Sequence, residues 1–412
     1  MESFFNLKKP AEVFQIIDQF ESIGTEGICL EDAVGRALSK AIEAKEDLPS
    51  FFKSTMDGYA VRAEDTFGAT EGLPALFNII GEVSMGKAPQ IKVGQGQAVR
   101  ISTGGMLPEK ADGVVIREYC YMLDKKTLEI SKAISPLENV IQPGDDFERG
   151  TIVKAKGSTL LPHTIGALSG LGYTTVDVFK KPKVAIISSG DEIIAIDKHP
   201  KPGEVRDINR YSLAAFCHHA GAEPVFMGLA PDSLGILHNM AEQAIEEADM
   251  LWISGGSSVG TRDLTLKVFE SLDDFELLVH GISISPGKPT IIGKAGFKPV
   301  IGLPGHVASA LIVAEVFLAR LIRKLAGFND YAKETWTWVK ARLDRNLESV
   351  SGRQDYVRVK LIKKGDSFLA EPLFGKSGLI SPLVESDGLL PIDINTEGLY
   401  KDQQVKVMKL IG

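Results

Sequence analysis

The chain has 412 residues, of which 44% are hydrophobic and 24% are charged, and 46 Lys and Arg against 54 Asp and Glu give a formal net charge of -8. These are ordinary globular values, so they exclude disordered, collagenous and fibrous proteins, and the length predicts roughly two to four domains. A net acidic chain has no overall attraction for nucleic acid or an anionic membrane, although a local basic pocket for a small anion stays open.

The cysteines and the N-terminus bear on the cellular compartment. Cys29, Cys120 and Cys217 are far apart and odd in number, which predicts neither a disulfide framework nor a CxxC metal site. No apolar run approaches the roughly 20 residues that span a bilayer, and the N-terminal segment lacks the apolar stretch and cleavage site of a secretory signal. We therefore expect a cytoplasmic protein with no membrane partner.

The first predicted element is an amphipathic helix over residues 10–23, since Val13, Phe14, Ile17 and Phe20 share one helical face. Residues 56–146 alternate short β-rich pieces with Gly, Pro and Asp, which predicts a small β-rich domain. Residues 150–177 indicate a strand, a helix from about Pro162 and a second strand, forming a structural framework.

The second half of the chain changes character. Residues 182–327 alternate apolar strands with helices, which predicts a doubly wound α/β domain. Its last helix, over about residues 307–325, carries Arg320, Arg323 and Lys324 in its final turns and is followed by Gly327, as is typical of a helix C-terminus. The strand-like, turn-rich tail over residues 334–412 predicts a small all-β domain.

Three polar loops follow predicted strands of the α/β domain, where ligands of open α/β sheets bind. They are Ser188–Glu192, Ser254–Gly260 with Asp263 after it, and Gly302–His306. Glycine-rich loops either present backbone N–H groups to phosphates and oxyanions or simply make tight turns; three at strand ends, two with carboxylates, favour anion binding. None is a Walker A loop or a G-x-G-x-x-G fingerprint, so an ordinary ATPase or dehydrogenase is not supported.

Several acids are candidates for chemistry. Glu192 and Asp263 are candidate ligands for Mg²⁺, which prefers carboxylate, water and phosphate oxygens. Asp232 is a third candidate, although an Asp at that place is also a good helix N-cap. Asp57 lies on what is otherwise an Asp-Gly turn, and Thr103 follows a predicted strand. The histidines lack a surrounding ligand set, so zinc is not expected.

Taken together, these strings resemble the molybdopterin molybdotransferase family, which includes the C-terminal E domain of gephyrin. The matching pieces occur in family order: MDGYAVR at Met56–Arg62, RISTGGMLPEKADGVV at Arg100–Val115, GDD at Gly144–Asp146, SGDEI at Ser189–Ile193, ISGGSSVGTRDLT at Ile253–Thr265, PGKP at Pro286–Pro289, GLPGHVASA at Gly302–Ala310 and SGRQDYVRV at Ser351–Val359. They span nearly the whole chain, and this combination of motifs is highly specific.

The resemblance implies an α/β plus β architecture in four parts. These are an extended framework domain (residues 1–50 and 147–181), a β-rich domain (51–146), a molybdopterin-binding-like α/β domain (182–328) and a C-terminal β-barrel-like domain (329–412). It also implies a homodimer, in which the α/β and C-terminal domains of one subunit share an active cleft with the β-rich domain of the other.

The reaction implied by the resemblance is the Mg²⁺-dependent insertion of molybdate into adenylylated molybdopterin, with release of AMP. Adenylylated molybdopterin contains a phosphate anhydride and molybdate is a compact dianion, so both are bound by N–H donors, a divalent cation and positively charged groups. The three polar loops of the α/β domain offer N–H donors and candidate metal ligands. The metal joins the dithiolene sulfurs of the pterin, in agreement with the absence of a cysteine cluster.

The family's functional residues carry over to named positions. The catalytic set implied by the resemblance is Asp57, Thr103, Asp146, Glu192 and Asp263, and the magnesium ligands are Glu192, Asp232 and Asp263. The residues expected to hold pterin, phosphate or oxyanion are Ser254, Gly255, Gly256, Ser258, Gly260, Lys288, Pro304, Gly305, Arg353 and Ser377.

The chain departs from the family pattern where that pattern is basic. Ile141-Gln142-Pro143 precedes Gly144-Asp145-Asp146, and Ser283-Ile284-Ser285 precedes the PGKP motif. Where the family usually has LPGNP, this chain has His306-Val307 in place of Asn-Pro, and Arg262 stands where the family often has a Tyr. Arg262, His280 and His306 are candidate replacements for the missing charge.

These departures keep other functions open: a divergent paralogue that inserts tungstate, a protein that stores or delivers the finished cofactor, and a non-enzymatic scaffold. The retained Asp57, Glu192 and Asp263 argue against a pure scaffold. Molybdate and tungstate cannot be separated from the sequence, because the two oxyanions have nearly the same size and charge.

Overall fold

A computed structural model describes residues 7–255, 259–332 and 336–410, and for residues 259–263 it describes the backbone. The chain forms two compact units, one of Met1–Lys40, Lys156–Leu160 and Thr175–Gly412 and the other of Ala41–Ala155 and Leu161–Thr174. Within the described ranges, no helix is both long enough and apolar enough to cross a membrane.

The larger unit contains an α/β sheet. Its strands lie in the order β16 (Glu223–Ala230), β13 (Lys183–Ser189), β17 (Met250–Gly255), β21 (Lys298–Pro304), β20 (Ile291–Ala295) and β18 (Phe275–His280). The first four are parallel and the last two are antiparallel to their neighbours. Because β13 lies between two later strands, the chain winds outward in both directions, which confirms the predicted doubly wound fold.

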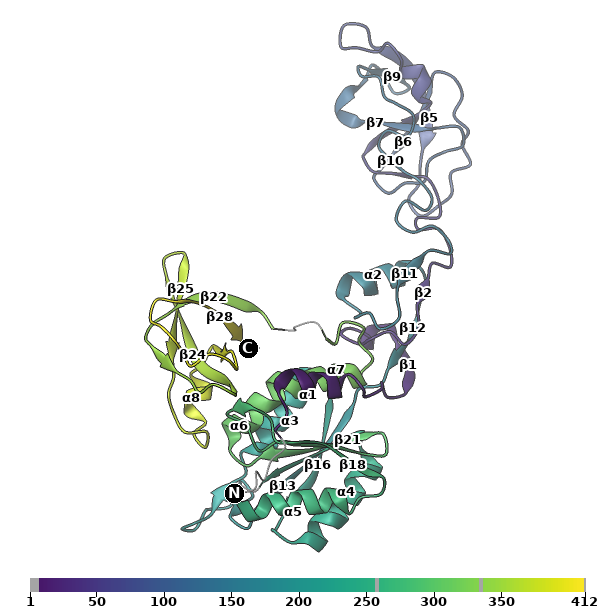
Figure 1. The fold of residues 1–412 in the computed structure, drawn as a ribbon. Coiled ribbons are helices and arrows are strands. Elements are labelled where there is room, and N and C mark those ends of the chain that lie inside the picture. The colour runs from purple at the N-terminus through teal and green to yellow at the C-terminus, as the bar shows by residue number, and fades with distance from the viewer. Residues whose placement is uncertain (1–6, 256–258, 333–335, 411–412) are drawn as a thin grey trace. The chain divides into compact units, whose positions relative to one another are not determined.

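Helices cover both faces of this sheet (Figure 1). One face packs against α1 (Pro10–Ile17), α3 (Asn209–Ala220), α6 (Val307–Val313), the π-helical turn η4 (Ala314–Leu318) and α7 (Ala319–Leu325), and the other against α4 (Leu234–Glu247) and α5 (Val259–Glu270). Alternate residues of β13 divide between the two cores: Val184 and Ile186 face the first group, and Ala185 and Ile187 the second. Burial on both faces explains why the strand is a continuous apolar run.

Two helices differ in detail from expectation. The first was expected to reach Ile23, and this was wrong: α1 ends at Ile17, where Gln19 and Phe20 donate to carbonyls only three residues back. The apolar face was correctly placed, since Phe20 is still buried in the same core. The helix expected over residues 307–325 has those bounds, but a π-helical turn at residues 314–318 interrupts it.

The C-terminal part of this unit is a closed barrel. Its strands follow the order β24 (Gln354–Lys364), β25 (Ser367–Pro372), β22 (Trp338–Leu343), β28 (Gln404–Lys409) and β26 (Gly388–Ile392), and β26 pairs again with β24. The short strand β19 (Ile284–Ser285) of the α/β part adds to β24. Smaller elements here are α8 (Ser381–Val384), β23 (Leu347–Glu348) and β27 (Gly398–Leu399). The expected all-β tail thus includes one short helix.

The remaining pairs of the larger unit are β1 (Thr25–Cys29) with β12 (Thr175–Phe179) and β14 (Ile193–Ile194) with β15 (Val205–Arg206), and η1 (Leu30–Asp32) is a 3-10 turn.

The second unit is β-rich, as the sequence predicted. Its main sheet has the order β7 (Gly113–Ile116), β4 (Gly58–Val61), β6 (Gln97–Ile101), β5 (Ala75–Glu82), β9 (Thr127–Ile130) and β8 (Cys120–Met122). The framework elements in this unit are β2 (Ile42–Glu43) with β11 (Ile152–Lys154), β3 (Lys53–Ser54) with β10 (Val140–Ile141), and α2 (Pro162–Gly170). The 3-10 turns are η2 (Ala63–Thr66) and η3 (Arg117–Tyr119).

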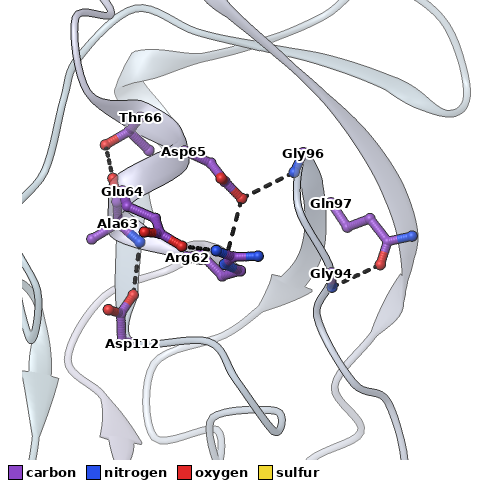
Figure 2. Close-up of polar contacts among 9 residues, drawn as sticks. All are labelled: Arg62, Ala63, Glu64, Asp65, Thr66, Gly94, Gly96, Gln97 and Asp112. Atoms are coloured by element: carbon purple, nitrogen blue, oxygen red, sulfur yellow. Dashed lines mark hydrogen bonds and ion pairs between the residues drawn. The ribbon is translucent and has the colours of Figure 1, made fainter.

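A network of polar contacts fixes η2, the turn after β4 (Figure 2). The Ala63 N–H donates to Oδ1 of Asp112 at 2.7 Å, and the Gly96 N–H donates to Oδ2 of Asp65 at 2.9 Å. Arg62 forms ion pairs with Glu64 and Asp65. These contacts anchor the end of the MDGYAVR strand, whose beginning carries Asp57.

Candidate oxyanion site

The polar loops of the α/β domain meet at one edge of the sheet. In the parallel register, Ser189 pairs with Gly255 and Gly255 pairs with Pro304, so β13, β17 and β21 end side by side. A Cβ at Gly255 would lie 2.3 Å from the Ser189 carbonyl oxygen, which explains a glycine at that strand end. The structure therefore places Ser254, Gly255, Pro304 and Gly305 together, as the strand pattern predicted.

Asn209, at the start of α3, ties two of these loops together. Its Nδ2 donates to Oγ of Ser254 at 2.6 Å and to the carbonyl oxygen of Gly305 at 2.8 Å. Asn209 is 8% exposed and Ser254 is fully buried. The sequence reasoning missed Asn209, because no local pattern distinguishes it from any other polar residue at a helix start.

Acids gather beyond the end of β13. Ser189 Oγ donates to Oδ1 of Asp232 at 2.8 Å, and the Asp232 N–H donates to Oδ1 of Asp191 at 3.1 Å. Asp191 thus closes the turn, and Glu192 next to it is exposed. Among the described side chains, no three His, Cys, Asp or Glu residues are placed to hold a metal ion. The Asp263 side chain lies outside the described residues, so the magnesium set stays a prediction.

A cleft of about 620 Å³ lies between the α/β domain and the barrel. We call it the cationic cleft and define it by Lys288, His306, Arg353, Arg358 and Ser377, which line it. The predicted binding residues Lys288, Pro304, Gly305, Arg353 and Ser377 all lie on its wall. They come from segments far apart in the sequence, which the structure brings into one cleft; what they bind stays a prediction.

Arg358 on β24 is the most unusual charge in the cationic cleft. The residue is 8% exposed, and one guanidinium nitrogen donates to the Gly375 carbonyl oxygen at 2.6 Å. The other terminal nitrogen, Nη1, is buried with no hydrogen-bond partner within the described residues. Burial lowers the pKa of this guanidinium, but arginine does not lose its proton in proteins. A buried cation without a carboxylate favours a bound anion. The sequence reasoning missed it, choosing Arg353 from the same motif.

Arg353 is held differently. Its Nε lies 2.8 Å from Oδ1 of Asp355, whose Oδ2 accepts a hydrogen bond from Ser349 Oγ at 2.8 Å. Asp355 is 7% exposed, so this carboxylate fixes the direction of Arg353 and neutralises part of its charge. The uncompensated positive charge of the cationic cleft therefore centres on Arg358.

In the β-rich unit, the structure brings Asp57 and Thr103 together. Asp57 precedes β4 and Thr103 follows β6, and Gly58 pairs with Ile101 across the two strands. A Cβ at Gly58 would lie 2.0 Å from the Val115 carbonyl oxygen, so the MDGYA glycine is required by the close approach of β7. Thr103 donates to Oδ1 of Asp57 through its N–H at 2.7 Å and its hydroxyl at 3.0 Å.

These hydrogen bonds set the charge state of Asp57. The bond from the Thr103 N–H, followed by that from its hydroxyl, holds the pKa of the exposed Asp57 carboxyl below its usual value, and Arg117 and Arg100 add to the effect. Asp57 is therefore a fixed anion at neutral pH. Asp146, on the turn after β10, is also exposed, and its N–H donates to the Leu48 carbonyl oxygen at 3.0 Å.

Three predicted binding residues cannot be placed in full. Gly256 and Ser258 lie outside the described residues, and Gly260 belongs to the backbone of α5.

Region models of one protein family match the chain in order. A MoeA N-terminal region (domain I and II) matches residues 9–172, a probable molybdopterin binding domain matches residues 185–324, and a MoeA C-terminal region (domain IV) matches residues 340–410.

Individual proteins match over nearly the whole length. A crystal structure of a molybdopterin biosynthesis MoeA protein from Pyrococcus horikoshii is 36% identical, with a TM-score of 0.84, and the match covers 99% of this chain and 100% of that one. A protein of Methanocaldococcus jannaschii with a provisional molybdopterin biosynthesis name is 34% identical over 97% of this chain and 96% of its own length. A molybdopterin molybdenumtransferase of Bacillus subtilis is 28% identical over 96% and 93%.

Proposed function

Because this chain belongs to the MoeA family, we propose that it is a molybdopterin molybdenumtransferase, an enzyme that inserts molybdate into adenylylated molybdopterin and releases AMP. The observation that carries the proposal is the cationic cleft, in which Arg358 is buried without a carboxylate partner in the described chain and which Lys288 and Arg353 also line. Such a cleft suits a doubly charged oxyanion.

The residues of the cleft suggest how the reactants are held. Lys288, Arg353 and Arg358 would neutralise the negative charge of molybdate and of the phosphate groups, which otherwise repel each other. Asn209 would keep the Ser254 and Gly305 loops in one arrangement through the two hydrogen bonds it donates. Holding both reactants in a fixed geometry lowers the entropic part of the barrier.

We propose that the enzyme uses Mg²⁺ and that Glu192, Asp232 and Asp263 hold it. The donor chemistry fits, since Mg²⁺ takes one or two carboxylates together with water and substrate phosphates. Asp232 is already oriented by the Ser189 hydroxyl on Oδ1. Glu192 is exposed and follows Asp191, whose Oδ1 accepts the Asp232 N–H. When bound, the ion would supply charge neutralisation at the phosphate anhydride.

The family resemblance further leads us to propose a homodimer in the cytoplasm, with Asp57 and Asp146 acting on substrate held by the partner subunit. Subunit complementation tests this. Asp57→Ala and Lys288→Ala, each inactive alone, should recover part of the activity when mixed and allowed to exchange subunits. A monomer in light scattering, or a mixture that stays inactive, would contradict the shared site.

Reconstitution tests the function itself. Purified protein is mixed with adenylylated molybdopterin, Mg²⁺ and molybdate, and AMP release is followed; a parallel reaction contains tungstate instead. We expect AMP release that requires both the oxyanion and Mg²⁺. Absence of AMP with either oxyanion would rule out the transferase, and release with tungstate alone would assign the protein to tungsten.

A further inference from the structure

His306 of the cationic cleft is held at one ring nitrogen. Its Nδ1 lies 2.7 Å from the Ser377 Oγ, and the Ser377 carbonyl oxygen accepts a hydrogen bond from the Ala308 N–H at 3.2 Å. Gly378 lies against the ring, since a Cβ there would be 3.8 Å from Nε2. The imidazole is thus fixed between the loop before α6 and the barrel loop that carries Ser377.

The second ring nitrogen, Nε2, has no hydrogen-bond or ion-pair partner in the parts of the chain that the structure describes. When Nδ1 accepts the Ser377 hydroxyl proton, the neutral ring carries its own proton on Nε2, and a protonated ring carries one on both nitrogens. In the other neutral tautomer Nδ1–H donates to the Ser377 oxygen and Nε2 is an acceptor. An anion in the cleft stabilises the two forms that carry an N–H on Nε2.

A second histidine–serine pair, His238 with Ser271, allows a comparison of the contacts that Nε2 makes. His238 Nδ1 lies 2.8 Å from Ser271 Oγ, whose hydroxyl donates to the Val268 carbonyl oxygen at 2.7 Å, and His238 Nε2 lies 3.3 Å from Oε1 of Glu242. There an acid of the chain occupies the second nitrogen. His306 is exposed and lines the cleft, in which Lys288, Arg353 and Arg358 outnumber Glu348 and Asp355, and Asp355 is already paired with Arg353.

We propose that His306 is an additional oxyanion-binding residue: its Nε2–H donates to an oxygen of the bound oxyanion while Nδ1 keeps Ser377 in place. The proposal rests on the proposed function, because it takes the cationic cleft as the oxyanion site of the transferase. It assigns a role to the one position of the GLPGH motif where this chain departs from the usual asparagine.

Two substitutions separate the ring nitrogens. His306→Asn keeps a polar group near the Nδ1 position and can still reach Ser377, but it has nothing at the Nε2 position. His306→Gln places an amide N–H near the Nε2 position. Binding of radiolabelled molybdate to the full-length protein is measured by equilibrium dialysis, and thermal unfolding verifies that each variant is folded. His238→Asn is the matched control, since it alters the same kind of pair outside the cleft.

We expect His306→Asn to bind molybdate about tenfold more weakly, the effect of losing one hydrogen bond to a charged group. His306→Gln should recover most of the affinity, and His238→Asn should bind as the unaltered protein does. Equal affinity of His306→Asn and the unaltered protein would overturn the proposal, as would a His306→Gln variant as weak as His306→Asn, or an unaltered protein that binds no molybdate.

The AMP-release assay keeps this inference apart from the proposed function. If the unaltered protein turns over and His306→Asn binds molybdate normally, only the role of His306 fails. If the variants bind as expected but no AMP is released, the oxyanion contact stands and the transferase reaction fails.

Discussion

Two cavities, each lined by both the α/β domain and the C-terminal barrel, contain a charged side chain without an ion-pair partner in the described residues. The side chain is an arginine in one cavity and a glutamate in the other. The cationic cleft, of about 620 Å³, contains Arg358, whose Nη1 has no partner within the described residues. A second cavity of about 490 Å³ lies against η4 and contains Glu315; its other lining residues are Leu311, Ile312, Leu383, Ser386, Asp387, Lys409 and Leu410. We call it the Glu315 cavity.

The difference between the two cavities lies in what each charge can do without a ligand. The Glu315 carboxyl has no hydrogen bond or ion pair within the described chain, and burial raises its pKa to about 7. Glutamate can therefore take up a proton and become neutral. Arginine cannot release one, so Arg358 stays charged and needs a counter-anion. An unpaired buried charge thus points to a ligand in the first cavity and only to a proton in the second.

Replacing Arg358 should have the largest effect and is the sharpest test of this comparison. Arg358→Met removes the charge but keeps much of the side-chain volume. We expect kcat/KM to fall by about thirtyfold or more, because loss of one partner of a buried charge pair costs about 2–5 kcal/mol. The free energy of unfolding without substrate should change little, because removal of a buried charge stabilises the fold while loss of the hydrogen bond to the Gly375 carbonyl oxygen destabilises it.

Arg342→Met, at an exposed position on β22 of the same barrel, is the control and should leave both quantities unchanged. If Arg358→Met lowers stability but keeps its activity, the guanidinium stabilises the barrel and does not bind a ligand. The proposed difference between Arg358 and Glu315 would then be wrong.

Glu315→Gln tests the other side of the comparison through pH. The folded protein keeps the Glu315 proton up to a pH of about 7, whereas in the unfolded chain the ordinary pKa is 4.5. Between these values the folded state binds more protons, so the free energy of unfolding falls as the pH rises. Above about pH 7 the ionised carboxylate should cost up to about 3 kcal/mol, which Glu315→Gln removes.

Urea unfolding at about pH 5 and about pH 8 measures this effect, with the exposed Glu246 on α4 replaced by Gln as the control. The unaltered protein and Glu246→Gln should both lose stability between the two pH values, and Glu315→Gln should lose less. Equal losses in all three would show that Glu315 has an ionic partner or a bound cation, and the two cavities would then behave alike.

The sequence predicted those features that depend on local pattern. Apolar strands followed by Gly and acids placed Ser254, Gly255 and Gly305 at one sheet edge, because the ends of parallel strands must meet there. The bounds of the helix over residues 307–325 were also read correctly, but its π-helical turn was not. The sequence contains no signal for this turn, because consecutive residues on both sides of it are apolar and buried, so the shift of face that an extra residue causes leaves no mark on the pattern.

What the sequence did not predict depends on contacts between distant segments. The sequence pattern of β24 does not tell whether Arg358 faces solvent or the interior. Its burial follows from the closure of the barrel, which the local sequence does not reveal. Asn209 meets Ser254 and Gly305 across 45 and 96 residues. α1 stops early, and Asp18 after it pairs with Arg320 of α7 at 2.6 Å, a contact that the local helical pattern does not contain.

The smallest effect is expected at Asn209, which holds loops without contacting the oxyanion. Asn209→Ala removes two hydrogen bonds worth about 1 kcal/mol each, and we expect KM for the substrate to rise by about tenfold with a smaller change in kcat, because the loops lose their fixed spacing. Asn139→Ala removes one amide-to-carbonyl bond, to Val114 at 2.8 Å in the β-rich unit, and places alanine at a φ of 60°. Both changes lower stability, so this variant serves as the control for lost stability alone. If both variants lower stability but neither changes KM, the loops keep their arrangement without Asn209, and the charges of the cationic cleft suffice to hold the substrate.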